Sequence, residues 1–314
     1  MTDMLREMLR VPTVSTDEGR MREYIALQIG EYFPEKSVDS YGNLILRRPG
    51  GGKRILICAP MDDFGVIATR AEKDRVNISG LGKFDFYSAS YSTVTFSNGT
   101  RAVLIPPKSI DENTKLSDFT AFTGEIAEDS KRVMPGDKGY FESNAFSLTD
   151  GLLCGQGLSS RVGAAVVMAA VKEKIIPCAE CDCDVTLLFY AASKLDCRGL
   201  YIGASGQIEK VGKSFDFAAV VTAHDEVNGA CEVGKGLALR LVSRRFVCPE
   251  TVVGKVKSYF ENRSLPLQLF SDNTSDSPAA ELAQVYTGIP VCELCVPVRN
   301  YATSAEITYF SVEK

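Results

Sequence analysis

The sequence predicts an α/β fold: a mostly parallel sheet with helices on both faces, into which a small all-β domain is inserted. Apolar runs that are typical of buried strands alternate with segments of helical spacing. Continuous apolar strands of this kind indicate a parallel sheet buried on both faces. From about residue 71 to 148 the pattern changes to short alternating strands with polar turns. We therefore expect an α/β domain of residues 1–70 and 149–314, and an inserted β-barrel-like domain of residues 71–148.

The N-terminal part predicts one helix and the first strands of the sheet. Met21, Ile25 and Ile29 recur at helical spacing, and Ser15 or Thr16 stands before them as a candidate N-cap. Strands are expected at residues 37–48, broken by a turn at 41–43, and at residues 54–59.

The inserted segment contains a strong hairpin signal. Alternating residues 91–96 and 101–105 flank Asn98 and Gly99, and an Asn-Gly pair between two such segments favours a tight turn.

After Gly155 the α/β alternation resumes. Helices are expected at residues 162–170, 252–260 and 278–286, and strands at 184–192, 217–223, 265–270 and 290–298.

Composition excludes several classes of function. The longest apolar stretch, residues 162–171, is far shorter than the ~20 residues of a membrane helix. A net charge of −5 without a basic block argues against nucleic acid or a membrane surface as the partner. The N-terminus lacks the apolar core of a secretory signal, so the 10 cysteines are expected in a reducing cytoplasm. The chain has a single histidine, His224, which excludes zinc sites built on several imidazoles.

The strand at residues 54–59 ends in Pro60 and the adjacent acids Asp62 and Asp63. In open α/β sheets, ligands bind beyond the carboxyl ends of the strands. This end of the strand is therefore the first candidate for a functional site.

Five stretches in this order carry a resemblance that covers essentially the whole chain. They are Pro60-Met-Asp-Asp-Phe-Gly65, Gly155-Gln-Gly-Leu-Ser-Ser-Arg-Val-Gly163, Ser193-Lys-Leu-Asp-Cys-Arg-Gly199, Thr274-Ser-Asp-Ser277 and Pro297-Val-Arg-Asn-Tyr-Ala-Thr303. Their order resembles that of the glutamyl aminopeptidase and tetrahedral aminopeptidase family, some of whose members are labelled endoglucanase M. The resemblance implies an α/β domain with an inserted β domain, two zinc or cobalt ions, and aminopeptidase activity.

The scaffold positions of the family motifs are kept, with Glu306 just downstream of the last one. They are Asp62, Gly65, Arg161, Gly163, Arg198, Gly199, Asp276, Pro297, Arg299 and Glu306.

The positions that carry the family's chemistry are changed. By the resemblance, the positions of two ligand histidines hold Pro60 and Ala302, and the position of the metal-bridging Asp holds Ser159. The positions of a ligand Glu and a ligand Asp hold Lys194 and Thr222. Ser193 takes the position of the general-base Glu, and Asp62 that of the acid that orients the first histidine. Proline and alanine have no side-chain donor, neutral hydroxyls bind such ions poorly, and an ammonium repels them. We therefore expect no metal or other cofactor.

The favoured interpretation is a non-catalytic binding or assembly protein that takes a small ligand or a peptide. The resemblance implies a homo-oligomer formed through the inserted β domain. The alternative is an active hydrolase, either with displaced metal ligands Asp62, Asp63, His224 and Asp225, or metal-free with a Ser159/Lys194 dyad. Glycan hydrolysis needs two carboxylates that face across a cleft, whereas Asp62 and Asp63 are adjacent and should diverge.

Several residues have two interpretations. The candidate pocket residues are Asp62, Asp63, Arg161, Arg198, Asp276 and Arg299. We expect Asp62 to pair with the Lys194 ammonium, because a buried carboxylate needs a partner. The three arginines either form a pocket for an anion or are structural ion-pair partners, and the second interpretation is favoured.

His224, followed by Asp225 and Glu226, is either a remnant of a metal cluster or, as we favour, a surface or capping residue. The cysteines invite a zinc site built from Cys178, Cys181 and Cys183, with Cys292 and Cys295 nearby. Cys292 and Cys295 lie three apart on a strand and should point to opposite faces, so a zinc site is disfavoured.

Overall fold

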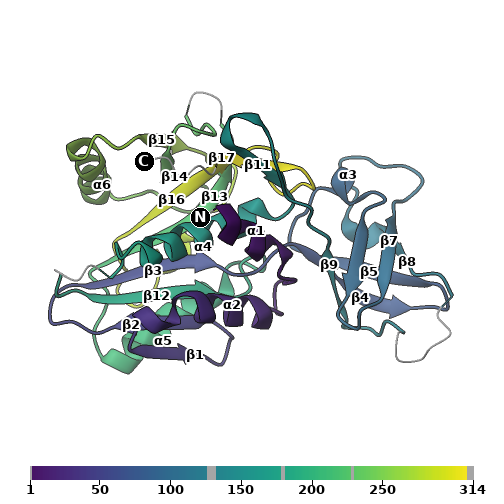
Figure 1. Ribbon diagram of the computed structural model, residues 1–314, viewed down its shortest axis with the longest axis horizontal. Helices are drawn as coiled ribbons and strands as arrows, with labels where there is room; N and C mark the ends of the chain where they lie inside the picture. The colour runs from purple at the N-terminus through teal and green to yellow at the C-terminus, as the bar shows by residue number, and fades with distance from the viewer. Residues whose placement is uncertain (1, 126–131, 178–180, 228–229, 310–314) are drawn as a thin grey trace.

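The computed structural model describes residues 2–125, 132–177, 181–227 and 230–309. A large α/β part and a smaller β-barrel lie at opposite ends of an elongated molecule (Figure 1). The predicted fold class, with a small barrel-like sheet beside the main one, is confirmed.

An eight-stranded sheet forms the centre of the α/β part, in the order β1-β2-β12-β3-β13-β16-β14-β15. The strands are β1 (Glu35–Val38), β2 (Leu44–Arg48), β3 (Arg54–Pro60), β12 (Asp184–Tyr190), β13 (Phe217–Asp225), β14 (Leu237–Val242), β15 (Leu267–Ser271) and β16 (Val291–Val298). The four central strands β12, β3, β13 and β16 pair in parallel. β2 and β14 pair antiparallel with β12 and β16, so the sheet is mixed towards its edges.

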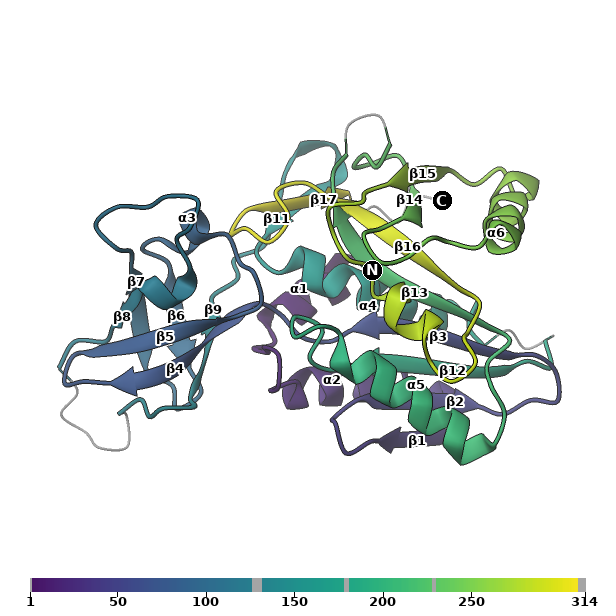
Figure 2. The ribbon, with the colours of Figure 1, turned by 180° about the vertical axis from the view of Figure 1, so that it is seen from behind.

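Helices cover both faces of this sheet, which explains why β12 is buried at every position. On one face lie α1 (Thr2–Arg10), α2 (Gly19–Ile29) and α4 (Leu158–Lys172), and on the other α5 (Arg198–Val211), α6 (Glu250–Asn262) and α7 (Ala279–Ala283). In Figure 1, α1, α2 and α4 lie in front of the sheet. Figure 2 shows the molecule from behind, and in that view α5 lies in front of the sheet. Each face has its own apolar core.

The barrel closes in the order β4-β5-β8-β7-β6-β9. Its strands are β4 (Gly65–Ala71), β5 (Arg75–Leu81), β6 (Thr93–Phe96), β7 (Arg101–Ile105), β8 (Thr120–Phe122) and β9 (Lys138–Phe141), with a short helix α3 (Phe86–Ala89). The register of β4 and β9 sets Gly65 opposite Tyr140, so the first and last strands of the barrel are neighbours. The hairpin expected around Asn98-Gly99 joins β6 and β7.

The barrel begins earlier and ends earlier than the expected boundaries of residues 71 and 148. β4 starts at Gly65, directly after the Asp62-Asp63 pair, and β9 ends at Phe141. The next strands, β10 (Phe146–Ser147) and β11 (Leu152–Gly155), form a small sheet with β17 (Glu306–Tyr309) instead. The apolar pattern of residues 65–71 has the same period in either domain, so it does not mark where the insertion begins.

The expected N-cap of the second helix is wrong. Helix α2 begins at Gly19, after Glu18, and neither Ser15 nor Thr16 caps it. The Ser15 hydroxyl donates to Asp62 instead, and Thr16 adopts a left-handed φ of 72°. Helices α1 and α5 and strands β14 and β17 were not anticipated.

No helix within the described residues is long and apolar enough to cross a membrane.

Gly163 lies where helix α4 approaches strand β13 closely. A Cβ at this position would lie 2.3 Å from the carbonyl oxygen of Val221 on β13. We expect Gly163→Ala to lower the free energy of unfolding by about 1–3 kcal/mol, as overpacking does. Gly254 in α6 is the control, because a Cβ there would meet nothing within 4 Å. Gly254→Ala should raise stability by about 0.5–1 kcal/mol in the same urea titration, and equal losses in both variants would contradict this account.

Candidate functional site

A cavity of about 540 Å³ lies where the central strands end, between the sheet and the start of the barrel. Pro60 closes β3, Ser193 and Lys194 follow β12, and Thr222 lies on β13. Ser159 joins them from the first turn of α4. The structure thus brings together five of the six positions at which the sequence suggested changed chemistry.

Ala302, the sixth position, lies beside this cavity and not on its wall. It is buried against the barrel core, and its neighbour Tyr301 lines the cavity in its place. The carbonyl oxygen of Ala302 accepts a hydrogen bond of 3.0 Å from the backbone N–H of Asp85, which fixes this turn to the barrel.

Asp62 does not form the ion pair that was expected with the Lys194 ammonium. Its carboxylate is fully buried and accepts hydrogen bonds from the Ser15 hydroxyl and from the backbone N–H groups of Ser193 at 2.9 Å and Lys194 at 3.2 Å. These donors satisfy the carboxylate without a counter-ion. Asp62 thereby holds the turn after β12 in place.

The Lys194 side chain turns towards the barrel. Its ammonium Nζ lies 4.2 Å from the ring centroid of Phe64, a cation–π contact. Its Cβ packs against Gly82, whose φ of 87° and missing side chain leave the necessary space. Burial opposes the charged form of Lys194, but Tyr301, Asp62 and other acids outweigh it and raise the pKa above its ordinary value. A positive charge is therefore held in the cavity at neutral pH.

Ser159 is bonded to Glu306 and not to Lys194, so the Ser159/Lys194 dyad is not formed. The hydroxyl and the backbone N–H of Ser159 both donate to the buried Glu306 carboxylate, the latter at 2.8 Å. The backbone N–H of Ala302 donates to the same carboxylate at 2.7 Å. Burial raises the pKa of Glu306 to about 7, against the opposing effect of these donors.

A buried network that the sequence did not suggest surrounds Thr222. The Thr222 hydroxyl donates to Glu293 at 2.8 Å, and the other oxygen of Glu293 lies 3.5 Å from the Arg240 guanidinium. Arg240 also donates to Ser275 and to the carbonyl oxygens of Asp272 and Asp276. A signal was present, because Arg240 and Glu293 each interrupt an apolar strand, and a buried charge requires a partner.

His224 is not the surface residue that was expected. It is 9% exposed, and its two ring nitrogens lie 3.1 Å from the Asp272 carboxylate and 2.8 Å from the Asp225 carbonyl oxygen. Asp272 is partly buried, but hydrogen bonds from Ser275, Thr274 and His224 lower its pKa. Glu226 is directed elsewhere, to Arg299 at 2.6 Å, so residues 224–226 do not converge on one point.

The arginines do not gather into one anion pocket. Arg161 is buried and lies 3.4 Å from Asp63, outside the cavity, and Arg198 is exposed. Arg299 pairs with Glu226 at the surface. Asp276 lies at the cavity edge, where Arg244 and Arg245 pair with it.

The side chains of Asp62 and Asp63 point in different directions, as expected from their adjacent positions in the sequence. Asp62 faces Ser15 and the turn after β12, whereas Asp63 faces Arg161 and a different cavity. They do not face each other across a cleft.

The cysteines show no zinc site where they are described. Cys178 lies outside the described residues. Cys292 packs in the core covered by α6 and α7, whereas Cys295 lies in a separate cluster with Cys231.

The two metal ions that the resemblance implies do not fit these residues. The side chains of Pro60 and Ala302 have no atom that could bind a metal ion. The hydroxyls of Ser159 and Thr222 already donate hydrogen bonds to carboxylates, and Lys194 carries a positive charge. Two dications at close range require anionic ligands to offset their repulsion. Within the described ranges, no group of three or more His, Cys, Asp or Glu side chains is placed to hold a metal ion.

Comparison with known families gives one match that covers most of the chain. The family model described as M42 glutamyl aminopeptidase matches residues 42–311. A protein of Acetivibrio thermocellus, whose name assigns it provisionally to the aminopeptidases, is 25% identical over 99% of this chain and 94% of its own length.

Solved structures with low sequence identity share the fold. An aminopeptidase of the archaeon Desulfurococcus kamchatkensis superposes with a TM-score of 0.86 at 19% identity, covering 98% of this chain and 90% of that one. The TET1 peptidase of Pyrococcus horikoshii, described as able to assemble into a tetrahedron or a large octahedral shell, has a TM-score of 0.85 at 20% identity, covering 98% and 94%.

Glu306 predicts a specific dependence of stability on pH. Its pKa is about 7 in the folded state against an ordinary value of 4.5, so between these values only the folded state holds the proton. The contribution of this group to stability is therefore present at low pH and is lost as the pH rises through this window. Relative to Glu306→Gln, the wild type should lose at most about 3 kcal/mol of unfolding free energy between pH 4.5 and 7.

Urea titrations at a series of pH values measure this difference. Glu23→Gln, the same change at an exposed position of α2, is the control and should follow the wild type across the series. A constant difference between the wild type and Glu306→Gln would contradict the buried, proton-binding state of Glu306.

Proposed function

This chain belongs to the M42 glutamyl aminopeptidase family, and we propose that it acts there as a binding or assembly protein without metal ions or peptidase activity. The proposal rests on the residues that this chain has at the five positions where the family's metal ligands are expected. They supply a lysine ammonium, two hydroxyls that donate to buried carboxylates, a proline and an alanine. No imidazole or carboxylate occupies any of them.

The position of the general base supports the same conclusion. Ser193 stands there, and its hydroxyl is buried without a hydrogen-bond partner in the described part of the chain. A serine hydroxyl does not accept a proton from water near neutral pH as a carboxylate does. A reaction that depends on an activated water has no base at this position.

The alternative hydrolase mechanisms find little support in the geometry. The Ser159 hydroxyl donates to Glu306, so Lys194 is not placed to take its proton. The displaced metal ligands lie apart, since Asp63 lines a different cavity from His224 and Asp225.

The cavity itself is suited to bind a ligand. Its volume of about 540 Å³ lies within the range of small-molecule sites. No carboxylate of the described residues lies within ion-pair distance of Lys194, so its ammonium is available to an anionic group, as in a small acid or the carboxylate of a peptide.

We also propose that the chain forms a homo-oligomer through the barrel, in the cytoplasm. The likeness to the TET1 peptidase, which is described as able to assemble into a shell, supports a homo-oligomer. The barrel has an apolar stripe on its outer face, formed by Val103 and Ile105 of β7 and Phe122 of β8, which are 37%, 40% and 45% exposed. Val103 and Phe122 are register partners, so the stripe is continuous across the two strands. Such a patch is typical of a contact between proteins.

Metal content tests the proposed loss of activity. The purified wild type should contain zinc and cobalt well below one ion per chain and should not hydrolyse amino-acyl anilides. A variant that restores the family residues should instead bind about two zinc ions per chain. Its six changes are Pro60→His, Ser159→Asp, Ser193→Glu, Lys194→Glu, Thr222→Asp and Ala302→His.

Lys194→Met is the control for that experiment, because it removes the positive charge but adds no ligand and should bind no zinc. Stoichiometric metal in the wild type, or turnover that a chelator abolishes, would contradict the proposal. Turnover that resists chelator and disappears in Ser159→Ala would favour the metal-free hydrolase.

Sedimentation velocity tests the barrel interface. We expect the double variant Ile105→Lys, Phe122→Lys to shift the protein to smaller species, because burying two ammonium groups in an apolar contact is unfavourable. Leu27→Lys on α2 is the control, since Leu27 is 81% exposed and lies in the α/β part. A wild type that sediments as a monomer, or a double variant with an unchanged distribution, would refute this interface.

A further inference from the structure

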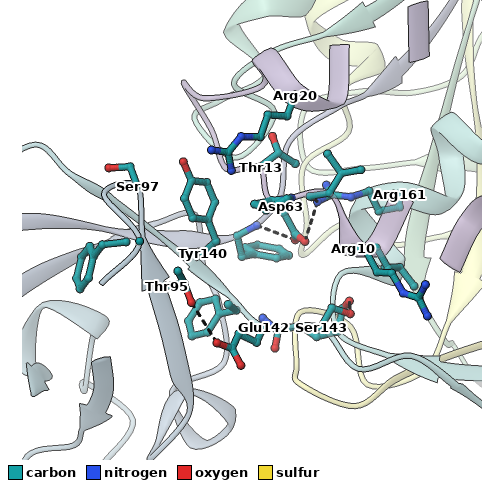
Figure 3. A pocket seen from close by; sticks show the side chains of 18 residues that line it. Arg10, Thr13, Arg20, Asp63, Thr95, Ser97, Tyr140, Glu142, Ser143 and Arg161 are labelled. Carbon is teal, nitrogen blue, oxygen red and sulfur yellow. Dashed lines mark hydrogen bonds and ion pairs between the residues drawn. The ribbon is translucent and has the colours of Figure 1, made fainter. Parts of the chain in front are cut away.

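A second cavity, of about 360 Å³, lies between the connection from α1 to α2 and the barrel strands β6 and β9 (Figure 3). Residues 9–13 and Arg20 form its α/β wall, and residues 95–97 and 140–143 form its barrel wall. Phe64 is the single residue that lines both this cavity and the first. Nothing in the proposed function uses this second space.

The charges that line this cavity are unequal. Arg161 at its inner wall is neutralised by Asp63 at 3.4 Å, and Glu142 by Arg101 at 2.9 Å. Arg10 and Arg20 also line the cavity, and the guanidinium group of neither makes a hydrogen bond or an ion pair with any described residue. Figure 3 shows these two side chains on either side of the Arg161–Asp63 pair. The cavity therefore has an excess of positive charge at its exposed edge.

Gln156 supplies a polar group inside this cavity. The residue is 7% exposed and lines the cavity, and its side-chain amide makes no hydrogen bond with a described residue. Its oxygen and nitrogen are not among the fully buried polar atoms that lack a partner, so the amide faces accessible space in the cavity. A ligand with hydrogen-bonding oxygens would satisfy the Gln156 side chain and approach the two free guanidinium groups from the same space.

We propose that this cavity binds a small anion that carries a carboxylate or phosphate group. Arg10 and Arg20 bind the charge at the edge of the cavity, and the amide of Gln156 donates to the ligand within it. Guanidinium groups are well suited to both kinds of oxyanion, because their donors match them in pairs. The bound anion contacts the α/β part and the barrel at once, and so links the two.

Calorimetric titration at constant ionic strength tests the proposal, with inorganic phosphate, succinate and L-glutamate as separate probes. At least one probe should bind saturably with one site per chain. Binding of phosphate alone identifies a phosphate site, and binding of succinate or glutamate alone identifies a carboxylate site. The double variant Arg10→Gln, Arg20→Gln should weaken that binding about tenfold or more. Gln156→Leu should weaken it as well.

Arg75→Gln is the matched control, because Arg75 is an exposed arginine of the barrel whose one ion-pair partner among the described residues is its neighbour Asp74. Its affinity should equal that of the wild type. The proposal is overturned if none of the probes binds saturably, if the double variant binds as well as the wild type, or if Arg75→Gln weakens binding equally. Arg10 and Arg20 are exposed, so their substitution keeps the test decisive even if Gln156→Leu does not fold.

Discussion

The parallel pairing of β3 with both β12 and β13 is the constraint on which the rest of the site depends. In this register Pro60 lies beside Tyr190, and Ile57 lies beside Ala219, so the three strands end at the same edge of the sheet. The segments that follow must therefore turn into one shared space. The barrel is inserted at the end of β3, which closes that space from the other side.

Three buried acids, Asp62, Glu293 and Glu306, lie around the site. Asp62 accepts hydrogen bonds from a serine hydroxyl and two backbone N–H groups, and Glu306 accepts three. Glu293 accepts one from Thr222 and forms an ion pair with Arg240, and its second oxygen accepts no hydrogen bond from a described residue. Buried carboxylates persist only with such partners. The partners of these acids come from the protein itself, and they fix the turns that surround the cavity.

The sequence was sufficient for the fold class, because apolar period and motif order depend on short stretches of chain. It also named five residues that line one cavity, although their role stays a prediction. It failed where partners come from distant segments. The Lys194 ammonium contacts Phe64, which lines the cavity just before the first barrel strand, and only the backbone N–H of Lys194 bonds to Asp62. His224 pairs with Asp272, from a loop that no local pattern connects to it. The start of the barrel at Gly65 was missed because the strand period is the same on both sides of the boundary.

The first and last strands of the barrel, β4 and β9, are neighbours, so the barrel is an insertion whose two ends lie side by side. Gly65 and Tyr140 are directly paired, so a short turn between these two points would reconnect the chain without moving β3 or β11. The barrel also has its own apolar core. None of the barrel strands pairs with the eight-stranded sheet, so insertion or exchange of the whole unit at these two points requires no change in the strand order of that sheet.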